Sequence, residues 1–185
     1  ECLSNTLDIT NNVFAGNSIP SGGTGGLRLS SYGTSPTIDF VNNTVTANRG
    51  RGFYAYSDGP SGDTEDFTLN LHNCIISGNY PVSSNDDAVF DQDTGEGNLM
   101  VDCRNTILGS WDDNDTDFTP TDVSLSSDPG LGDDFYPLPS SSAINSAYAA
   151  SAPAEDKDGN SRVDAADIGA LEYQGSAHQA TSAPP

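Results

Sequence analysis

The chain repeats one pattern of apolar residues and asparagines with a period of 31 residues. Asn11, Asn42 and Asn73 are each 31 residues apart, and the step from Asn73 to Asn105 is 32. Such regularity is typical of a stacked architecture, in which each unit buries its apolar face against the next. The repeats read LDITNNVFAGN (7–17), IDFVNNTVTAN (38–48), LNLHNCIISGN (69–79) and VDCRNTILGS (101–110).

Each repeat contains short strands and no segment of helix length. Its apolar residues are β-branched or aromatic and are bounded by turns rich in Gly and Asn. Further apolar runs lie between the repeats at 26–29, 52–56 and 88–90. The pattern predicts an all-β fold, a β-solenoid of about four coils with like residues stacked ~4.8 Å apart. The expected core columns are Ile9, Phe40, Leu71 and Cys103, and Phe14, Val45, Ile76 and Leu108.

One asparagine column recurs at the turns. Asparagine tolerates the left-handed backbone of a tight turn, and its amide can hydrogen-bond the asparagine of the next coil. We therefore interpret this column as a structural ladder and not as a reactive site. Its members are Asn11, Asn42, Asn73 and Asn105.

The I-x-N-N-x-x-x-x-N phrase resembles the right-handed parallel β-helix repeat of pectate-lyase-like proteins. The second half resembles the closing motif of bacterial surface β-helix proteins that have a choice-of-anchor region. Its matching runs are DPGL (128–131), FYPL (135–138), SAINSA (142–147), DKDGNSRV (156–163) and DIGALEY (167–173). Asn145 departs from that group, which has Asp at this place. The resemblance implies a right-handed parallel β-helix and supplies no catalytic residues.

The chain divides into three expected regions: coils at 1–110, an irregular capping segment with the closing motif at 111–173, and a tail at 174–185. Prolines and an acidic loop after residue 110 argue against regular central strands, so this segment is expected to cover the C-terminal end of the stack. The candidate lid residues are Trp111, Phe118, Phe135, Tyr136 and Leu138. No comparable segment precedes Leu7, so we expect an uncapped N-terminal coil.

Charge excludes two classes of partner. The chain has 27 acidic and 6 basic residues, a net charge of −21, which gives nucleic-acid phosphates little to bind and opposes anionic membranes. No apolar run approaches the ~20 residues of a membrane span. The acidic, lysine-poor composition suggests an extracellular or cell-surface location.

The cysteines number three, which allows at most one internal disulfide. Cys74 and Cys103 lie on neighbouring coils but three positions out of column, a slippage of ~10 Å along a strand. We predict that both are free thiols.

A candidate calcium loop lies within the closing motif. Oxygen ligands that alternate along a short loop can surround one cation at ~2.4 Å. Ser161 stands where such loops usually have glycine, and the alternative is a solvated acidic turn that binds nothing. The six candidate positions are Asp156, Asp158, Asn160, Arg162 (through its backbone), Asp164 and Asp167.

Catalysis and carbohydrate binding have weaker signals. Polysaccharide cleavage needs a base beside calcium-binding carboxylates, and no acidic column stands beside the arginines. His72 lies in an outward column with Arg104, and the sequence shows neither a Ser-His-Asp order nor a nucleophile elbow. Tyr54 and Tyr56 lie on one side of their strand. They form a sugar-stacking platform if Phe53 is in the core, and none if they point inward.

The sequence therefore favours a non-catalytic extracellular β-helix that acts as a structural, adhesive or self-assembling surface module. Association through the uncapped N-terminal coil would be head-to-tail and could produce filaments. The alternative is a β-helix that binds or cleaves a polysaccharide. Ca²⁺ is the candidate cofactor in either case.

Overall fold

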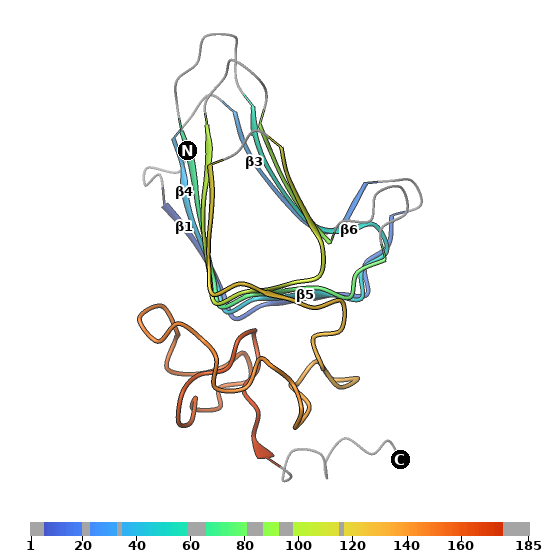
Figure 1. Ribbon diagram of the computed structural model, residues 1–185, viewed down its shortest axis with the longest axis vertical. Coiled ribbons are helices and arrows are strands. Elements are labelled where there is room, and N and C mark those ends of the chain that lie inside the picture. Colours follow the sequence, from blue (N-terminus) through green and yellow to red (C-terminus); the bar gives the residue numbers. More distant parts are fainter. Residues whose placement is uncertain are drawn as a thin grey trace.

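The chain is all-β. A computed structural model describes residues 6–19, 23–32, 35–58, 66–80, 87–92, 98–114 and 117–175. Cys2 and residues 176–185 of the expected tail lie outside these ranges. The described residues contain no α-helix, and consequently no helix long and apolar enough to cross a membrane. All paired strands are parallel, and they wind around a common interior in a solenoid-like stack (Figure 1).

Three parallel sheets form the walls of this stack. Sheet 1 consists of β1 (Thr6–Thr10), β4 (Thr37–Val41), β7 (Phe67–His72), β10 (Leu99–Arg104) and β13 (Asp117–Thr121). Sheet 2 consists of β2 (Val13–Ala15), β5 (Thr44–Thr46), β8 (Ile75–Ile76), β11 (Ile107–Leu108) and β14 (Ser124–Leu125). Sheet 3 consists of β3 (Thr24–Tyr32), β6 (Arg51–Asp58), β9 (Ala88–Gln92) and β12 (Trp111–Asn114).

The strand register follows the sequence repeat. Ile9 pairs with Phe40, Phe40 with Leu71, and Leu71 with Cys103, which is the column that the repeat predicts. The second expected column pairs in the same way through sheet 2. The 31-residue period therefore corresponds to one step from a strand to its neighbour in the same sheet.

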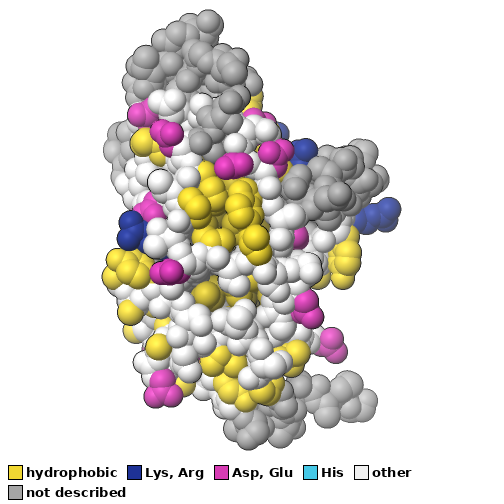
Figure 2. Space-filling view, viewed as in Figure 1, with side chains coloured by type: hydrophobic (Ala, Val, Ile, Leu, Met, Phe, Trp, Pro, Cys, Tyr) yellow, Lys and Arg dark blue, Asp and Glu magenta, His cyan; other side chains and the backbone are white. Residues whose placement is uncertain are grey.

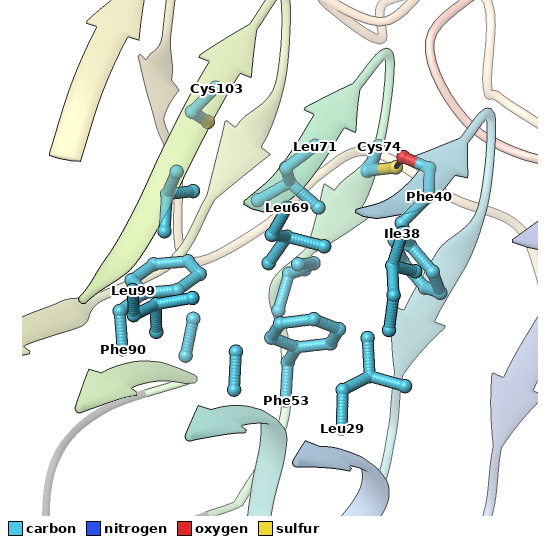
Figure 3. Packing of buried hydrophobic residues seen from close by; sticks show 14 of the residues in the cluster. Leu29, Ile38, Phe40, Phe53, Leu69, Leu71, Cys74, Phe90, Leu99 and Cys103 are labelled. Carbon is cyan, nitrogen blue, oxygen red and sulfur yellow. Dashed lines mark hydrogen bonds between the residues drawn. The ribbon is translucent and has the colours of Figure 1, made fainter. Parts of the chain in front are cut away.

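Phenylalanines run through the interior from one end of the stack to the other. Ring centroids lie 6.2 Å apart for Phe14–Phe40, 5.2 Å for Phe40–Phe53, 6.0 Å for Phe53–Phe90 and 5.1 Å for Phe90–Phe118. Figure 3 shows Phe40, Phe53 and Phe90 pointing into one space with leucines of sheet 1. Burying each of the three fully buried rings, Phe40, Phe53 and Phe90, stabilises the fold by about 1.5–3 kcal/mol.

A left-handed residue makes the turn from sheet 1 to sheet 2 in every repeat. The φ angles are 58°, 49°, 56° and 44° at Asn11, Asn42, Asn73 and Asn105, and Asp122 continues the series at 54°. Asn and Asp occupy this conformation at lower cost than other residues with a Cβ. The structure therefore explains why a short polar residue recurs at this place.

Ladders between repeats are made chiefly by two other asparagine columns. The Oδ1 of Asn43 accepts hydrogen bonds from the backbone N–H of Asn12 at 2.8 Å and from its Nδ2 at 3.2 Å. In the same way, Asn48 Oδ1 accepts from the backbone N–H and the Nδ2 of Asn17. Asn79 Oδ1 accepts the corresponding two hydrogen bonds from Asn48. In the expected column, Asn73 donates to Asn42 at 3.1 Å. The remaining amides of that column bond elsewhere, as described below.

The stack continues beyond the expected boundary at residue 110. Strands β12, β13 and β14 extend all three sheets to Leu125. Pro120 fits in β13 because an edge strand has one side without a neighbour, so a missing N–H is tolerated there. Trp111 and Phe118 belong to these strands and pack against the core.

Residues 128–173, which we call the closing segment, lie against the outer face of sheet 2 (Figure 1). Ile168 and Ala143 pack on Ile75 and Ile107 of that face. A side chain at Gly169 would come within 2.8 Å of Ile75 Cδ1, so the contact requires glycine. The expected cover over an end of the stack is instead a cover along its side.

One end of the stack is visible in Figure 2. Hydrophobic side chains are grouped there over the space that the three sheets enclose in Figure 1. Of the remaining lid candidates, Phe135 and Tyr136 pack beside Val13 of sheet 2, and Leu138 is exposed. These three therefore belong to the side cover.

Candidate functional site

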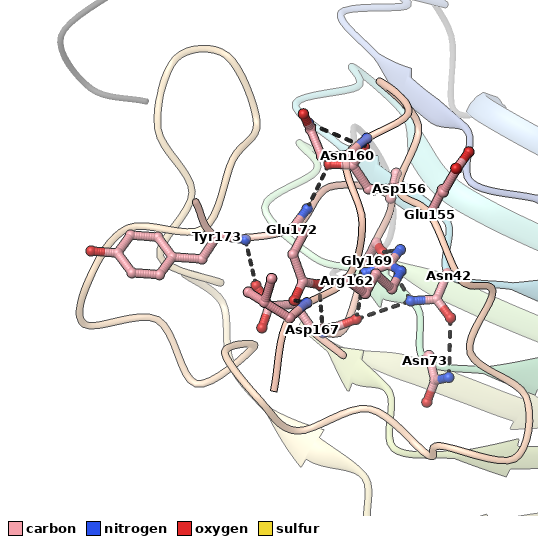
Figure 4. Close-up of polar contacts among 12 residues, drawn as sticks. Asn42, Asn73, Glu155, Asp156, Asn160, Arg162, Asp167, Gly169, Glu172 and Tyr173 are labelled. Carbon is pink, nitrogen blue, oxygen red and sulfur yellow. Dashed lines mark hydrogen bonds and ion pairs between the residues drawn. The ribbon is translucent and has the colours of Figure 1, made fainter. Parts of the chain in front are cut away.

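The asparagine column at the turns binds the closing segment. Asn11 Nδ2 donates to the carbonyl of Glu155 at 2.8 Å, and Asn105 Nδ2 donates to that of Ser146 at 2.9 Å. Asn42 donates to the carbonyls of Asp167 and Gly169 at 2.9 and 3.1 Å (Figure 4). Asn73 Nδ2 likewise donates to the carbonyl of Tyr148 at 3.1 Å. One amide from each repeat therefore attaches the closing segment to the stack.

Backbone N–H groups occupy the two buried carboxylates among the six candidate calcium ligands. Asp156 is buried, and its carboxylate accepts backbone N–H groups of Asp158, Asn160 and Glu172. Asp167 is also buried and accepts the N–H groups of Asn145 and Tyr173. Calcium binding by this loop stays a prediction.

Asp158 and Arg162 also have partners outside the loop, and Asp158 is exposed. Asp158 accepts from the hydroxyl of Tyr136 at 2.7 Å, and Arg162 Nη1 donates to Glu172 Oε2 at 3.0 Å. Asp164 is exposed. In the part of the chain that the structure describes, no three His, Cys, Asp or Glu side chains converge as a metal-binding group.

Arg162 and Glu172 form a buried ion pair that the sequence reading missed. Arg162 Nη1 lies 3.0 Å from Glu172 Oε2, and the two side chains are 3% and 1% exposed. The other terminal nitrogen donates to Asn11 Oδ1 and to the carbonyl of Gly169, both at 3.0 Å. A charge pair this deep requires hydrogen bonds to offset its lost hydration. Arg162 therefore connects the first repeat with the core of the closing segment.

Tyr54 and Tyr56 face outward from sheet 3. Phe53, which precedes them in the strand, is fully buried, which decides the alternative that the sequence left open. The two rings stack at 5.8 Å with an interplanar angle of 16°. The Arg28 guanidinium lies 5.3 and 5.8 Å from their centroids. The ring faces are therefore partly covered by each other and by arginine, and sugar stacking on them stays a prediction.

The same face carries further charges around Tyr54. The Arg51 guanidinium lies 5.5 Å from the centroid of the Tyr54 ring, and the Tyr54 hydroxyl donates to Asp91 at 3.1 Å. Burial raises the pKa of Tyr54, and the nearby Asp91 carboxylate adds to the effect. This face combines two cations, one carboxylate and two phenols.

A polar cluster on sheet 1 joins residues that are distant in the sequence. His72 Nδ1 lies 2.9 Å from Ser151 Oγ, and His72 Nε2 lies 3.4 Å from Asp102 Oδ2. Arg104 Nε donates to both oxygens of Asp102, at 2.8 and 2.9 Å. The His72 ring packs edge-on against Tyr148 at 6.0 Å. Serine, histidine and aspartate are thus in one chain of contacts.

The Arg104 guanidinium determines the charge of this cluster. Its hydrogen bonds lower the pKa of Asp102 below the usual range, and His72 contributes in the same direction. Asp102 therefore remains a carboxylate under ordinary conditions. The sequence did place His72 and Arg104 in one outward column, and the register confirms that they are paired. The sequence contained no signal that Ser151, 79 residues from His72, would contact these two residues.

Comparison with protein-family models, with curated proteins and with solved structures found no match to this chain.

Proposed function

We propose that the chain is a right-handed parallel β-helix of four coils and a partial fifth, of the pectate-lyase-like kind, with a choice-of-anchor closing motif. Its function is structural or adhesive, as a module of a secreted or cell-surface protein that self-associates through its N-terminal coil. The observation that carries this proposal is the difference between the two ends of the stack.

The C-terminal edge has features that oppose strand addition. The Thr121 carbonyl accepts from Asn105 N–H at 3.0 Å, so the alternation along β13 turns the nitrogen of Pro120 toward the open edge. Proline has no N–H to offer there. Asp113 pairs with the buried Phe90 and so occupies an inward position of the last strand. Edge prolines and inward-pointing charges both disfavour edge-to-edge pairing.

The N-terminal edge has a different chemistry. Among the described residues, β1 pairs only with β4, and its inward residue Leu7 is 50% exposed. Ile9, Phe14 and Leu27 lie against the core in this first repeat and are only partly buried. A second copy would cover these side chains and continue the strand ladder. Because the opposite edge is blocked, we expect N-terminal edges to meet in a two-fold dimer rather than a filament.

Leu7→Asp tests this edge by placing there the same kind of inward charge that Asp113 supplies at the other end. Light scattering coupled to size exclusion should show a dimer for the wild-type chain and a monomer for Leu7→Asp. Thr10→Asp, on the outward side of β1, is the matched control and should remain dimeric. A dimer that survives Leu7→Asp contradicts the proposed interface.

Pro120→Ala tests the blocked edge. Restoring an N–H on this side should let N-terminal and C-terminal edges pair, which would give species larger than a dimer. Each measurement is to be run with Ca²⁺ and with a chelator, because the predicted calcium loop lies in the closing segment. If Pro120→Ala forms no species larger than a dimer, the proposal that Pro120 blocks the C-terminal edge is contradicted.

A second candidate function is carbohydrate binding or cleavage on sheet 3. Arg28 and Arg51 beside two tyrosines form a local cationic and aromatic face on a chain of net charge −21. Such a face suits a carboxylated or sulfated sugar. A glycan array with wild type and Arg28→Ala separates this function from the structural one. Binding of an acidic glycan that Arg28→Ala abolishes would support it, and an array without signal would exclude it.

A further inference from the structure

The polar cluster on sheet 1 has the connectivity of a serine nucleophile with its base and its orienting acid. Ser151 Oγ contacts one ring nitrogen of His72, and Asp102 contacts the other. This is the arrangement by which a histidine takes the proton of a serine while a carboxylate fixes the ring. We propose that Ser151 is a nucleophile for acyl transfer from O-acyl esters, with His72 as general base and Asp102 as its orienting residue.

The hydrogen-bond partners determine the tautomer that this role requires. Asp102 is held as a carboxylate by Arg104 and can only accept, so His72 Nε2 carries the proton toward it. His72 Nδ1 then has a free lone pair directed at Ser151. The ring is fixed further by its edge-on contact with Tyr148, and the His72 side chain is 13% exposed.

The backbone positions the two halves of the cluster independently. His72 and Asp102 project from the outer face of β7 and β10, where they are held by strand pairing. Ser151 lies in the closing segment, in a turn closed by its own N–H to the carbonyl of Tyr148 at 3.1 Å. Asn73 accepts the Tyr148 N–H and donates to its carbonyl. The attachment of the closing segment is therefore what brings the hydroxyl to the base.

The cluster borders an open surface through Asp102. A hollow on sheet 1 is lined by Thr68, Met100, Val101, Asp102, Asp117, Phe118 and Thr119. Arg104 is 39% exposed and supplies a cation beside the carboxylate. A small neutral acyl group suits this hollow better than an anionic one, because Asp102 and Asp117 are among the residues that line it.

The reaction balances with water as the only co-reactant. Ser151 Oγ attacks the ester carbonyl carbon while its proton moves to His72 Nδ1. The carbon–oxygen bond to the alcohol breaks, and the departing alcohol oxygen takes that proton. Water then attacks the acyl carbon and gives a proton to His72. The bond from the acyl carbon to Ser151 Oγ breaks, Oγ recovers the proton, and the acid is released.

The test uses p-nitrophenyl acetate and a fluorophosphonate probe on the full chain. Wild type should hydrolyse the ester and be labelled on Ser151, as located by peptide mass spectrometry. Ser151→Ala and His72→Gln should each lose the label and reduce the rate on the order of 100-fold. Ser142→Ala, an exposed serine of the same segment, is the matched control and should keep both. Equal rates for wild type and Ser151→Ala, or label on other residues only, would overturn the proposal.

Ser151→Cys keeps the test valid if Ser151→Ala fails to fold. A thiol at this position should be alkylated by iodoacetamide, and faster than the same thiol in Ser151→Cys combined with His72→Gln. Asp102→Asn should lower the ester rate less than His72→Gln does, because it disturbs orientation and not the base itself. Alkylation at the same rate with and without His72 would show a purely structural contact.

Discussion

Asn42 Nδ2 lies 2.9 Å from the carbonyl oxygen of Asp167, so a turn of the second repeat is bonded directly to the closing segment. Asn42 is fully buried and has a φ of 49°. One residue thus makes a left-handed turn and holds a segment 125 residues away. The closing segment is in this sense part of the stack, attached along its side.

Asn42 allows the two roles to be separated. Asn42→Ala removes the amide and puts alanine in the left-handed region, which should lower the free energy of unfolding by about 2–4 kcal/mol. Asn42→Gly removes the same amide but tolerates the φ angle, so it should lose about 1–2 kcal/mol less. Urea denaturation followed by circular dichroism measures both. Equal losses for the two variants would show that the turn conformation contributes nothing.

The ion pair between Arg162 and Glu172 should be sensitive to removal of one partner. Arg162→Met leaves a buried carboxylate without its cation, which typically costs about 3–5 kcal/mol. Adding Glu172→Gln removes that charge and keeps one acceptor for the Val163 N–H, so the double variant should be more stable than Arg162→Met alone. Chemical denaturation gives the energies. Trypsin cleavage after the exposed Lys157 should become faster in step with the loss of stability. A double variant less stable than the single one would contradict this account.

Asp87 should make stability depend on pH. Burial raises its pKa above the usual range, although the N–H groups of Asn79 and Ser110 Oγ–H partly oppose the shift. A raised folded-state pKa gives a stabilisation that is complete below the unfolded-state pKa and is lost as the pH rises through the folded-state value. The free energy of unfolding of wild type minus that of Asp87→Asn should therefore fall as the pH rises from the acid range toward neutrality.

Asp102 provides the control of opposite sign for this titration. Arg104 lowers its pKa, so its stabilisation is present above the unfolded-state value and is lost as the pH falls through the folded-state value. The free energy of unfolding of wild type minus that of Asp102→Asn should accordingly rise with pH over the acid range. Both differences come from denaturation curves recorded at a series of pH values. If both free-energy differences changed in the same direction with pH, the opposite pKa shifts of Asp87 and Asp102 would be refuted.

The thiols of Cys74 and Cys103 are buried in the core and free. Burial raises the pKa of Cys103 to about 12, and that of Cys74 is raised also. At pH 8 neither should react with Ellman's reagent until the chain unfolds, because the thiolate is the reactive form. Cys2→Ser restricts the count to these two thiols, and two should appear on adding denaturant. Fast reaction of either thiol in the folded Cys2→Ser chain would be inconsistent with this packing.

The sheets could be predicted because the repeat encodes strand register directly. Ile9, Phe40 and Leu71 pair at the interval that separates them in the sequence. Strands β12 to β14 were missed because Pro120 and Asp113 oppose regular central strands, whereas an edge strand accommodates both. Proline and inward-pointing aspartate, which argue against a central strand, are the residues expected in the last strand of a sheet.

The attachment of the closing segment could not be predicted from side chains. Asn11 and Asn105 bind backbone carbonyls of that segment, and every residue has such a carbonyl. The double asparagine at 42–43 could have placed either residue in the interstrand ladder, and only the turn conformation assigns Asn43 to it. Ser151 reaches His72 for the same reason, as a consequence of where the segment lies.

Sedimentation velocity of the wild-type chain over a hundredfold range of concentration tests the proposed function most directly. The account predicts a monomer at the lowest concentrations that becomes a dimer as concentration rises, and a monomer throughout for Leu7→Asp. A wild-type chain that sediments as a monomer at every concentration would contradict self-association through the N-terminal coil.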